Sequence, residues 1–256
     1  MHILVFTRST PDTAATITVD ANGRVGWGDA ALVVNPWDEY ALEEAIVRGK
    51  EAGGKATVIA LGGEIHDEAL KHALAMGVDE AARVDDPALE TADSLAYAIT
   101  AAAAARNVDA QLILAGKESI DTGSDQHLVQ MARKLGWPYL SNVAHITALS
   151  DTSVTVERLI DGGKQTVTSS LPAVITVTKE INEPRYPSFI GIRKASKATI
   201  PVWSLADLGV SLPAPRAAVA GFRNLPAREA KTEMITGTPA EQAATLVDRL
   251  FEEKVL

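Results

Sequence analysis

Short runs of apolar residues alternate with stretches of helical periodicity along the first part of the chain. The run Ile3-Leu4-Val5-Phe6-Thr7 and two further runs, 57–61 and 111–115, predict buried strands, and a glycine follows each of the last two runs. Apolar residues recur every three or four positions over 65–74 and 95–105, which predicts amphipathic helices. Strands that alternate with helices favour a parallel sheet with helices on both faces.

Hairpin patterns replace this alternation after residue 138. The runs 154–160 and 165–170 flank Asp161-Gly162-Gly163 and predict a β-hairpin, and 173–178 predicts a further buried strand. A smaller hairpin is predicted around Asn22-Gly23. The second half of the sheet is therefore expected to carry antiparallel strands.

The C-terminal part is rich in proline and basic residues over 182–226 and has little periodicity. Helix is expected to return only at Thr238, where Thr-Pro-Ala-Glu forms a capping box and an apolar stripe follows. These patterns together predict an α/β fold, with a doubly wound and mostly parallel sheet, a β-hairpin extension and a C-terminal helical arm. The expected organisation is an α/β domain over 1–210, an irregular linker over 211–237 and a helical arm over 238–256.

Composition narrows the classes of function. The chain of 256 residues is 46% hydrophobic, enough for one large or two modest domains. The absence of cysteine excludes disulfides, thiolate catalysis and Cys-ligated metal centres. A net charge of −9 argues against a general nucleic-acid binder. No apolar run approaches the roughly 18 residues of a membrane span and no signal peptide is evident, so we expect a cytoplasmic protein.

The first candidate site is the segment Asn35-Pro36-Trp37-Asp38-Glu39. Asn35 suits a helix cap, Pro36 suits the first helical position, and the acidic pair suits the positive end of the helix dipole. A well-capped helix start alone would explain this pattern. The acidic pair makes the segment a poor phosphate site, but it is suited to an adenine or ribose edge.

The second candidate site is a loop that directly follows the predicted strand 111–115. Glycines and hydroxyls at the carboxyl end of a parallel strand, with a helix start ahead, offer free backbone N–H groups to an anion. An ordinary strand-to-helix loop remains the alternative, and neither a Walker A motif nor G-x-G-x-x-G is present. The loop comprises Gly116, Lys117, Glu118, Ser119, Ile120, Asp121, Thr122, Gly123, Ser124, Asp125, Gln126 and His127.

Catalytic patterns are sparse. The five histidines are dispersed and form no H-x-x-x-H or H-E-x-x-H pair, so no metal site is expected. The nucleophile motif G-x-S-x-G is also missing. The sequence favours nucleotide binding over bond breaking.

A basic stretch stands out in this acidic chain. Residues 179–197 hold five cations against two glutamates, with aromatic and aliphatic residues between them. Such a surface suits docking of an acidic protein partner, although a solvated proline-stiffened loop would look the same. The candidate docking residues are Arg185, Tyr186, Phe189, Ile190, Arg193, Lys194 and Lys197.

The order of several motifs resembles the beta subunit of electron transfer flavoproteins. The matching motifs are Asn35 to Glu39 with Leu42-Glu43-Glu44-Ala45, residues 73–79, Gly116 to Asp121, Trp137-Pro138, Glu157-Arg158 through Gly163, Leu171 to Val174, Asn182-Glu183-Pro184-Arg185-Tyr186 and residues 204–209. They cover about residues 1–210. Trp37-Asp38 and the run 191–195 are most similar to the branch that serves methylamine-type dehydrogenases.

The resemblance implies an electron carrier subunit, not an enzyme, in a heterodimer with an alpha subunit. It implies a domain like the adenine-nucleotide alpha hydrolases, with a structural AMP in this chain and a FAD held mainly by the alpha subunit. A loop over 182–198 would dock a flavin-dependent dehydrogenase through Phe189, where a leucine is common. By the resemblance, the AMP contacts fall on Phe6, Asn35, Pro36, Trp37, Asp38, Gly63 and Gly116 to His127.

Two other functions remain open. Electron-bifurcating members hold a second FAD in place of AMP and carry a proline that is absent after Gln126 here, which favours AMP. A stand-alone nucleotide-binding protein of the stress-protein type would explain residues 1–135 but not the hairpin, the 182–198 loop or the C-terminal helix.

Overall fold

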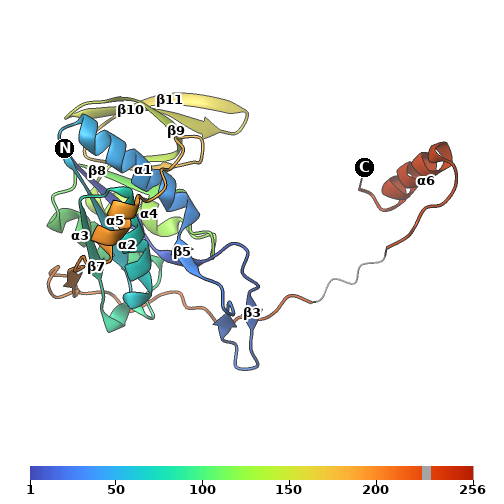
Figure 1. Cartoon of the computed structure of the whole chain (residues 1–256), viewed down its shortest axis with the longest axis horizontal. Coiled ribbons are helices and arrows are strands. Elements are labelled where there is room, and N and C mark those ends of the chain that lie inside the picture. Colours follow the sequence, from blue (N-terminus) through green and yellow to red (C-terminus); the bar gives the residue numbers. More distant parts are fainter. Residues whose placement is uncertain (227–231, 256) are drawn as a thin grey trace. The chain divides into compact units, whose positions relative to one another are not determined.

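The computed structural model describes residues 1–226 and 232–255, and the chain forms two compact units, 1–222 and 223–256 (Figure 1). The predicted linker thus includes residues 227–231, which lie outside the described residues, as does Leu256 of the predicted arm. The domain boundaries of the sequence analysis remain a prediction.

A nine-stranded sheet in the order β11-β10-β9-β12-β8-β1-β6-β7-β13 forms the centre of the first unit. In this spatial order, the seven strands from β9 across to β13 at the far edge are all parallel to one another. The pairs β9-β10 and β10-β11 of this sheet are antiparallel. The mostly parallel α/β fold with a hairpin extension is therefore confirmed. The strands are β1 (His2–Thr7), β6 (Lys55–Leu61), β7 (Glu80–Val84), β8 (Leu112–Gly116), β9 (Tyr139–Leu149), β10 (Ser153–Ile160), β11 (Gly163–Ser170), β12 (Ala173–Val177) and β13 (Val202–Trp203).

Alternating side chains of the buried strands build a separate core on each face of the sheet. In β1, Ile3 and Val5 join the core beneath α1 (Pro36–Glu51) and α2 (Asp67–Met76). Leu4 and Phe6 join the core beneath α3 (Ser94–Asn107) and α4 (Gln126–Leu135). Helices thus cover both faces, as a doubly wound sheet requires.

Two small antiparallel pairs lie between β1 and α1. The strands β2 (Ser9–Pro11) and β5 (Leu32–Val34) pair at the base of this excursion, and β3 (Thr18–Val19) pairs with β4 (Val25–Gly26) farther out. The hairpin predicted around Asn22-Gly23 is therefore confirmed. Two short 3-10 helices, η1 (Glu64–His66) and η2 (Pro87–Leu89), follow β6 and β7.

The expectation that helix returns only at Thr238 is wrong. A helix of seven residues, α5 (Phe189–Ala195), is capped by Ser188, whose hydroxyl accepts a hydrogen bond from the Gly191 N–H at 3.0 Å. Figure 1 shows α5 beside α2, and a Cβ at Gly191 would lie 2.2 Å from the Ala75 carbonyl oxygen. A helix this short shows little periodicity, and it depends on a close approach that only glycine permits.

The C-terminal helix α6 (Pro239–Glu252) begins with the predicted capping box. The Thr238 hydroxyl accepts a hydrogen bond from the Glu241 N–H at 3.4 Å, and the Glu241 carboxylate accepts one from the Thr238 N–H at 2.8 Å. The stripe side chains Leu246, Val247 and Phe251 are exposed in this structure.

A buried histidine joins β2 to the turn after β6. His66 is 9% exposed, and its Nδ1 accepts a hydrogen bond from the Ser9 N–H at 3.1 Å. Burial, followed by the positive charges of Arg8 and Arg83, lowers the pKa of His66 to about 4. Between pH 6.5 and 4 the unfolded chain therefore binds a proton that folded His66 rejects, so the free energy of unfolding falls as the pH falls.

His66→Gln should remove this part of the pH dependence. Between pH 6.5 and 5 we expect the free energy of unfolding of the wild type to fall by about 1.6 kcal/mol more than that of the variant. Urea unfolding at the two pH values measures the difference, with His145→Gln on β9 as the surface control. Equal losses in wild type and His66→Gln would contradict the assignment.

Candidate functional site

The candidate nucleotide site lies where the winding direction of the sheet reverses. The chain runs from β1 through β6 to β7 on one side and then returns to β8 on the other side of β1. The carboxyl ends of β1 and β8 therefore meet with no connection crossing between them. In open α/β sheets, this reversal point is the usual position of a ligand.

The first turn of α1 packs directly against the end of β8. The Asp38 carboxylate accepts hydrogen bonds from the Thr7 hydroxyl and from the Gly116 N–H, both at 3.1 Å. A Cβ at Gly116 would lie 2.5 Å from the backbone carbon of Trp37, so only glycine permits this approach. Burial raises the pKa of Asp38 to about 7, against the opposing effect of its hydrogen bonds.

Asn35 occupies the predicted cap position, but its side chain does not cap α1. Its Nδ2 donates to the Glu118 carbonyl and its Oδ1 accepts from the Ile120 N–H, both at 3.0 Å. The predicted N-cap position is therefore confirmed, but Asn35 makes no side-chain cap hydrogen bond there. The amide instead holds the loop from the other candidate segment, because it matches one backbone acceptor and one backbone donor.

The loop after β8 is folded by its own hydrogen bonds. The Gly123 N–H donates to the Ser119 carbonyl at 2.8 Å, and the Ser119 N–H donates to the Ser124 carbonyl at 3.1 Å. Gly123 has a φ of 61°, which favours glycine. The loop leads into α4, whose first N–H groups have no intrahelical acceptor, and Asp125 does not cap them with its side chain.

The structure thus brings the two predicted segments together. Lys117 lies 4.4 Å from the centroid of the Trp37 ring and 3.1 Å from a Glu118 oxygen. Phe6 and Gly63, the other two predicted site residues, lie outside these two segments. The Phe6 side chain packs in the core beneath α3 and α4, and its backbone lies within β1 opposite Ile59 of β6. Gly63 has open space at its Cβ position.

Sequence reasoning missed Arg8, the first residue after β1. One of its terminal nitrogens lies 3.2 Å from an Asp121 oxygen, while its buried Nε has no hydrogen-bond partner within the described part of the chain. The buried Trp37 Nε1 has none there either. A signal did exist, because Arg8 is the only Lys, Arg, Asp or Glu before Asp12 and directly follows an apolar strand.

The described residues contain neither a cluster of metal-ligating side chains nor a membrane-spanning helix. Within 1–226 and 232–255, no group of three or more His, Asp or Glu side chains could hold a metal ion. Helices of the same residues are all too short or too polar to span a membrane.

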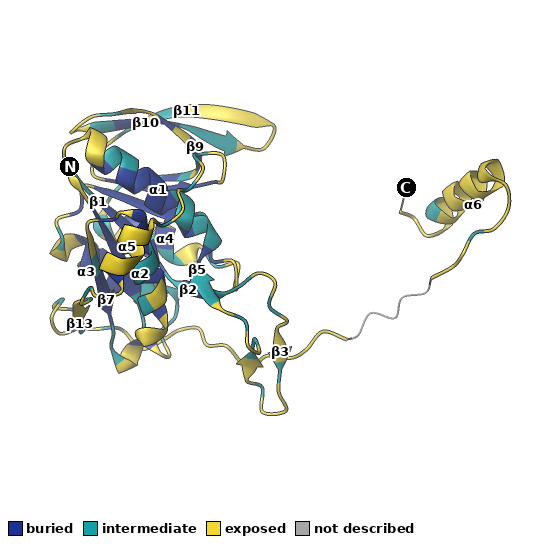
Figure 2. Cartoon of the chain, in the orientation of Figure 1, coloured by how far each residue is buried: buried dark blue, intermediate teal, exposed yellow. Residues whose placement is uncertain are grey.

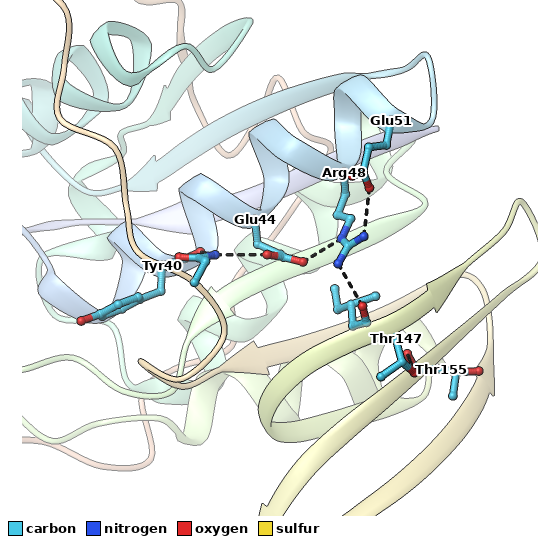
Figure 3. A network of polar contacts seen from close by, with 8 residues as sticks. Tyr40, Glu44, Arg48, Glu51, Thr147 and Thr155 are labelled. Atoms are coloured by element: carbon cyan, nitrogen blue, oxygen red, sulfur yellow. Dashed lines mark hydrogen bonds and ion pairs between the residues drawn. The ribbon is translucent and has the colours of Figure 1, made fainter.

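The second candidate region, the docking segment, comprises residues 182–198. Its Arg185 is tied back to α1, because the guanidinium donates two hydrogen bonds of 2.7 Å to the two carboxylate oxygens of Glu43. Asn182 donates to the Tyr40 carbonyl and to Glu44, both at 3.1 Å. α1 therefore holds the start of this segment (Figure 3).

The same network extends from α1 to the hairpin side of the sheet. Arg48 lies 2.7 Å from Glu44 and 2.9 Å from Glu51, and its third contact is a 2.9 Å hydrogen bond to the Ile146 carbonyl of β9 (Figure 3). In the docking segment, Arg185 differs from the other predicted docking residues because its charge is already paired with Glu43.

The remaining docking residues lie open to solvent. Tyr186, Phe189 and Ile190 are 95%, 93% and 83% exposed, and α5 is coloured mainly as exposed in Figure 2. The cations Arg193, Lys194 and Lys197 are exposed on and just after the same helix. Two aromatic side chains and one aliphatic side chain with this exposure, close in sequence to three cations, suit a protein interface.

Known proteins resemble this chain along its whole length. The family model described as electron transfer flavoprotein domain matches residues 29–208. The electron transfer flavoprotein subunit beta of Bacillus subtilis is 32% identical over 99% of this chain and 98% of its own length. The caffeyl-CoA reductase-Etf complex subunit CarD of Acetobacterium woodii is 34% identical over 100% of both chains. Protein FixA of Azorhizobium caulinodans is 28% identical over 99% of this chain and 95% of its own.

These matches agree with the resemblance drawn from the motifs, and they cover the strands and loops of the reversal point together with the docking segment. The chain belongs to the beta-subunit family of electron transfer flavoproteins.

Proposed function

We propose that this chain is the beta subunit of a heterodimeric, cytoplasmic electron transfer flavoprotein and that it binds one structural AMP. FAD, held mainly by the alpha subunit, supplies the redox chemistry. Electrons come from a flavin-dependent dehydrogenase and go to a downstream acceptor. This subunit holds the AMP and docks the dehydrogenase. It is therefore part of an electron carrier and is not an enzyme with a substrate of its own. Service to amine-type dehydrogenases remains a prediction.

The observation that carries the nucleotide proposal is the fixed loop in front of the open start of α4. Asn35 and the Gly116–Asp38 contact hold the first half of the loop, and the hydrogen bonds of Ser119 to Gly123 and Ser124 fold the second half toward α4. Backbone N–H groups ordered in this way suit a phosphate. The buried Nε of Arg8 and Nε1 of Trp37, which have no hydrogen-bond partner among the residues that the structure describes, offer further donors. Buried donors without partners are costly, and a bound nucleotide would satisfy them.

A second FAD at the same site is the competing proposal. The similarity to CarD, named as a subunit of a caffeyl-CoA reductase-Etf complex, keeps this alternative open. The sequence Gln126-His127-Leu128-Val129 at the start of α4, without the proline of the bifurcating pattern, favours AMP.

The nucleotide itself tests the proposal. The full chain expressed alone, precipitated with acid, should release about one AMP per chain and little FAD, measured by mass spectrometry. Gly116→Ala should lose most of the AMP, because the added Cβ would clash with the backbone of Trp37. Gly163→Ala is the matched control, since nothing lies within 4 Å of its Cβ position.

Three results would decide against AMP. Stoichiometric FAD in the lone chain would favour the bifurcating type. Turnover of ATP by the lone chain would favour a stress-type nucleotide protein. A chain without any nucleotide would argue against the site itself.

The docking proposal rests on the exposed side chains of α5. Phe189 is 93% exposed, and Gly191 seats the helix on α2, so the ring projects from a fixed base. The neighbouring cations would speed the approach of an acidic partner, and the ring would supply apolar burial.

Phe189→Ala should weaken electron transfer from the dehydrogenase. Loss of an anchor side chain costs about 2 kcal/mol, or roughly 30-fold in affinity. We expect KM for the flavoprotein to rise in a steady-state assay of the dehydrogenase, while flavin and AMP contents stay normal. Phe222→Ala, another exposed phenylalanine, is the control. Unchanged kinetics in Phe189→Ala would overturn the docking role.

The arm over 238–256 is proposed to pack on the alpha subunit. Leu246, Val247 and Phe251 are exposed on α6, and each such side chain gains roughly 1.5–3 kcal/mol on full burial. A lone helix of this length is marginal in water, so a partner surface is needed to stabilise it.

Deletion of residues 238–256 should weaken the heterodimer without unfolding the α/β unit, because residues 1–222 form a compact unit. Size-exclusion chromatography of the truncated chain mixed with the alpha subunit should show dissociation and a lower FAD content. The truncated chain should still bind AMP. A full heterodimer with normal flavin at sub-micromolar concentration would show that the arm has another role.

A further inference from the structure

Arg8 lies at the carboxyl end of β1, beside the loop of the candidate nucleotide site, and its backbone is fixed there. It follows the last residue of β1, and its carbonyl accepts a hydrogen bond of 2.9 Å from the Asn35 N–H. Asn35 also clamps the 118–120 part of the loop. The base of the Arg8 side chain is therefore fixed relative to both the sheet and the loop.

The guanidinium of Arg8 has unused donors. One terminal nitrogen lies 3.2 Å from Asp121, and the buried Nε has no partner among the described residues. The Arg8 side chain is 41% exposed, so its terminal nitrogens remain accessible. Asp121 is not dedicated to Arg8, because its other oxygen accepts a hydrogen bond of 2.6 Å from the Ser119 hydroxyl.

Other cations near the strand ends are already committed. Lys117 pairs with Glu118 and lies over the Trp37 ring. Arg83, which is 5% exposed, pairs with Asp67 and Asp85 and donates to the Gly62 carbonyl. Arg83 is therefore fixed in a buried network, whereas Arg8 keeps a donor without a partner among the described residues.

The surrounding histidines respond to this charge. Burial and then the charge of Arg8 lower the pKa values of both His66 and His127 to about 4, so both imidazoles are neutral near pH 7. Of the carboxylates around Arg8, Asp121 forms the ion pair, while Asp38 and Asp125 lie at the base and at the end of the loop. At neutral pH neither imidazole therefore adds a positive charge beside Arg8.

We propose that Arg8 binds the phosphate of a nucleoside monophosphate and exchanges Asp121 for that phosphate when the nucleotide enters. This inference rests on the proposed nucleotide function and names the residue that selects the phosphate. The planar guanidinium offers paired donors that match two phosphate oxygens. The start of α4 follows the same loop as Asp121 and can supply backbone donors to the same phosphate.

The charge balance of the loop favours one phosphate over a longer chain. Glu118, Asp121 and Asp125 are the acidic residues of the loop, and Lys117 is its only cation. Arg8 adds one positive charge that is free to move. A second or third phosphate would meet these carboxylates without a further free cation.

Paired titrations with AMP and adenosine test the proposal, since the two ligands differ only in the phosphate. The full chain is freed of nucleotide by unfolding and refolding and titrated in a calorimeter. Arg8→Gln should weaken AMP binding roughly ten- to a hundredfold and leave adenosine binding unchanged. Arg8→Lys should fall between, because it keeps the charge but not the paired donors. Arg24→Gln, at an exposed position, should behave as the wild type.

Asp121→Asn separates this role from a merely structural ion pair. If Arg8 is freed for the phosphate, the variant should bind AMP as tightly as the wild type or more tightly. Equal losses for AMP and adenosine in Arg8→Gln, or loss of AMP binding in Asp121→Asn, would show that the pair only holds the loop. A wild-type chain that binds neither ligand would overturn the proposed nucleotide function itself.

Discussion

The contact between the start of α1 and the end of β8 fixes the geometry of both functional regions. Gly116 lets the backbone of Trp37 approach, and the Asp38 carboxylate then satisfies the Gly116 N–H. This sets the position of a helix of 16 residues. Its first turn holds the loop of the nucleotide site, and its next turns hold the docking segment through Glu43 and Glu44. A shift of this helix would therefore move both regions together.

The parts that the sequence predicts well are those governed by local patterns. The strands at Ile3–Thr7, 57–61 and 111–115 are recognisable because buried parallel strands are continuous apolar runs. The capping box at Thr238 is recognisable because its two partners lie three residues apart. The loop 116–127 is recognisable because glycines follow a strand and precede a helix.

The parts that the sequence does not predict depend on distant partners. Asn35 is a cap by its local pattern, but its amide meets loop atoms 83 and 85 positions away. Arg8 gains a role only beside Asp121, and α5 forms only where Gly191 meets Ala75 on another helix. No periodicity carries such information, because tertiary contacts decide these positions.

The excursion between β1 and α1 is closed at its base. Its two ends are joined by the β2–β5 pairing and by the hydrogen bond from the Asn35 N–H to the Arg8 carbonyl. The span between β2 and β5 therefore forms a loop whose ends stay together whatever its length, and doubling such a loop costs only about 0.6 kcal/mol of closure entropy. Insertions, deletions or grafted recognition sequences between Pro11 and Leu32 should be tolerated with little effect on the sheet. The segment between β2 and β5 can therefore change in length and sequence, whereas the backbone of the neighbouring nucleotide site is fixed by the close approach of Gly116 to Trp37.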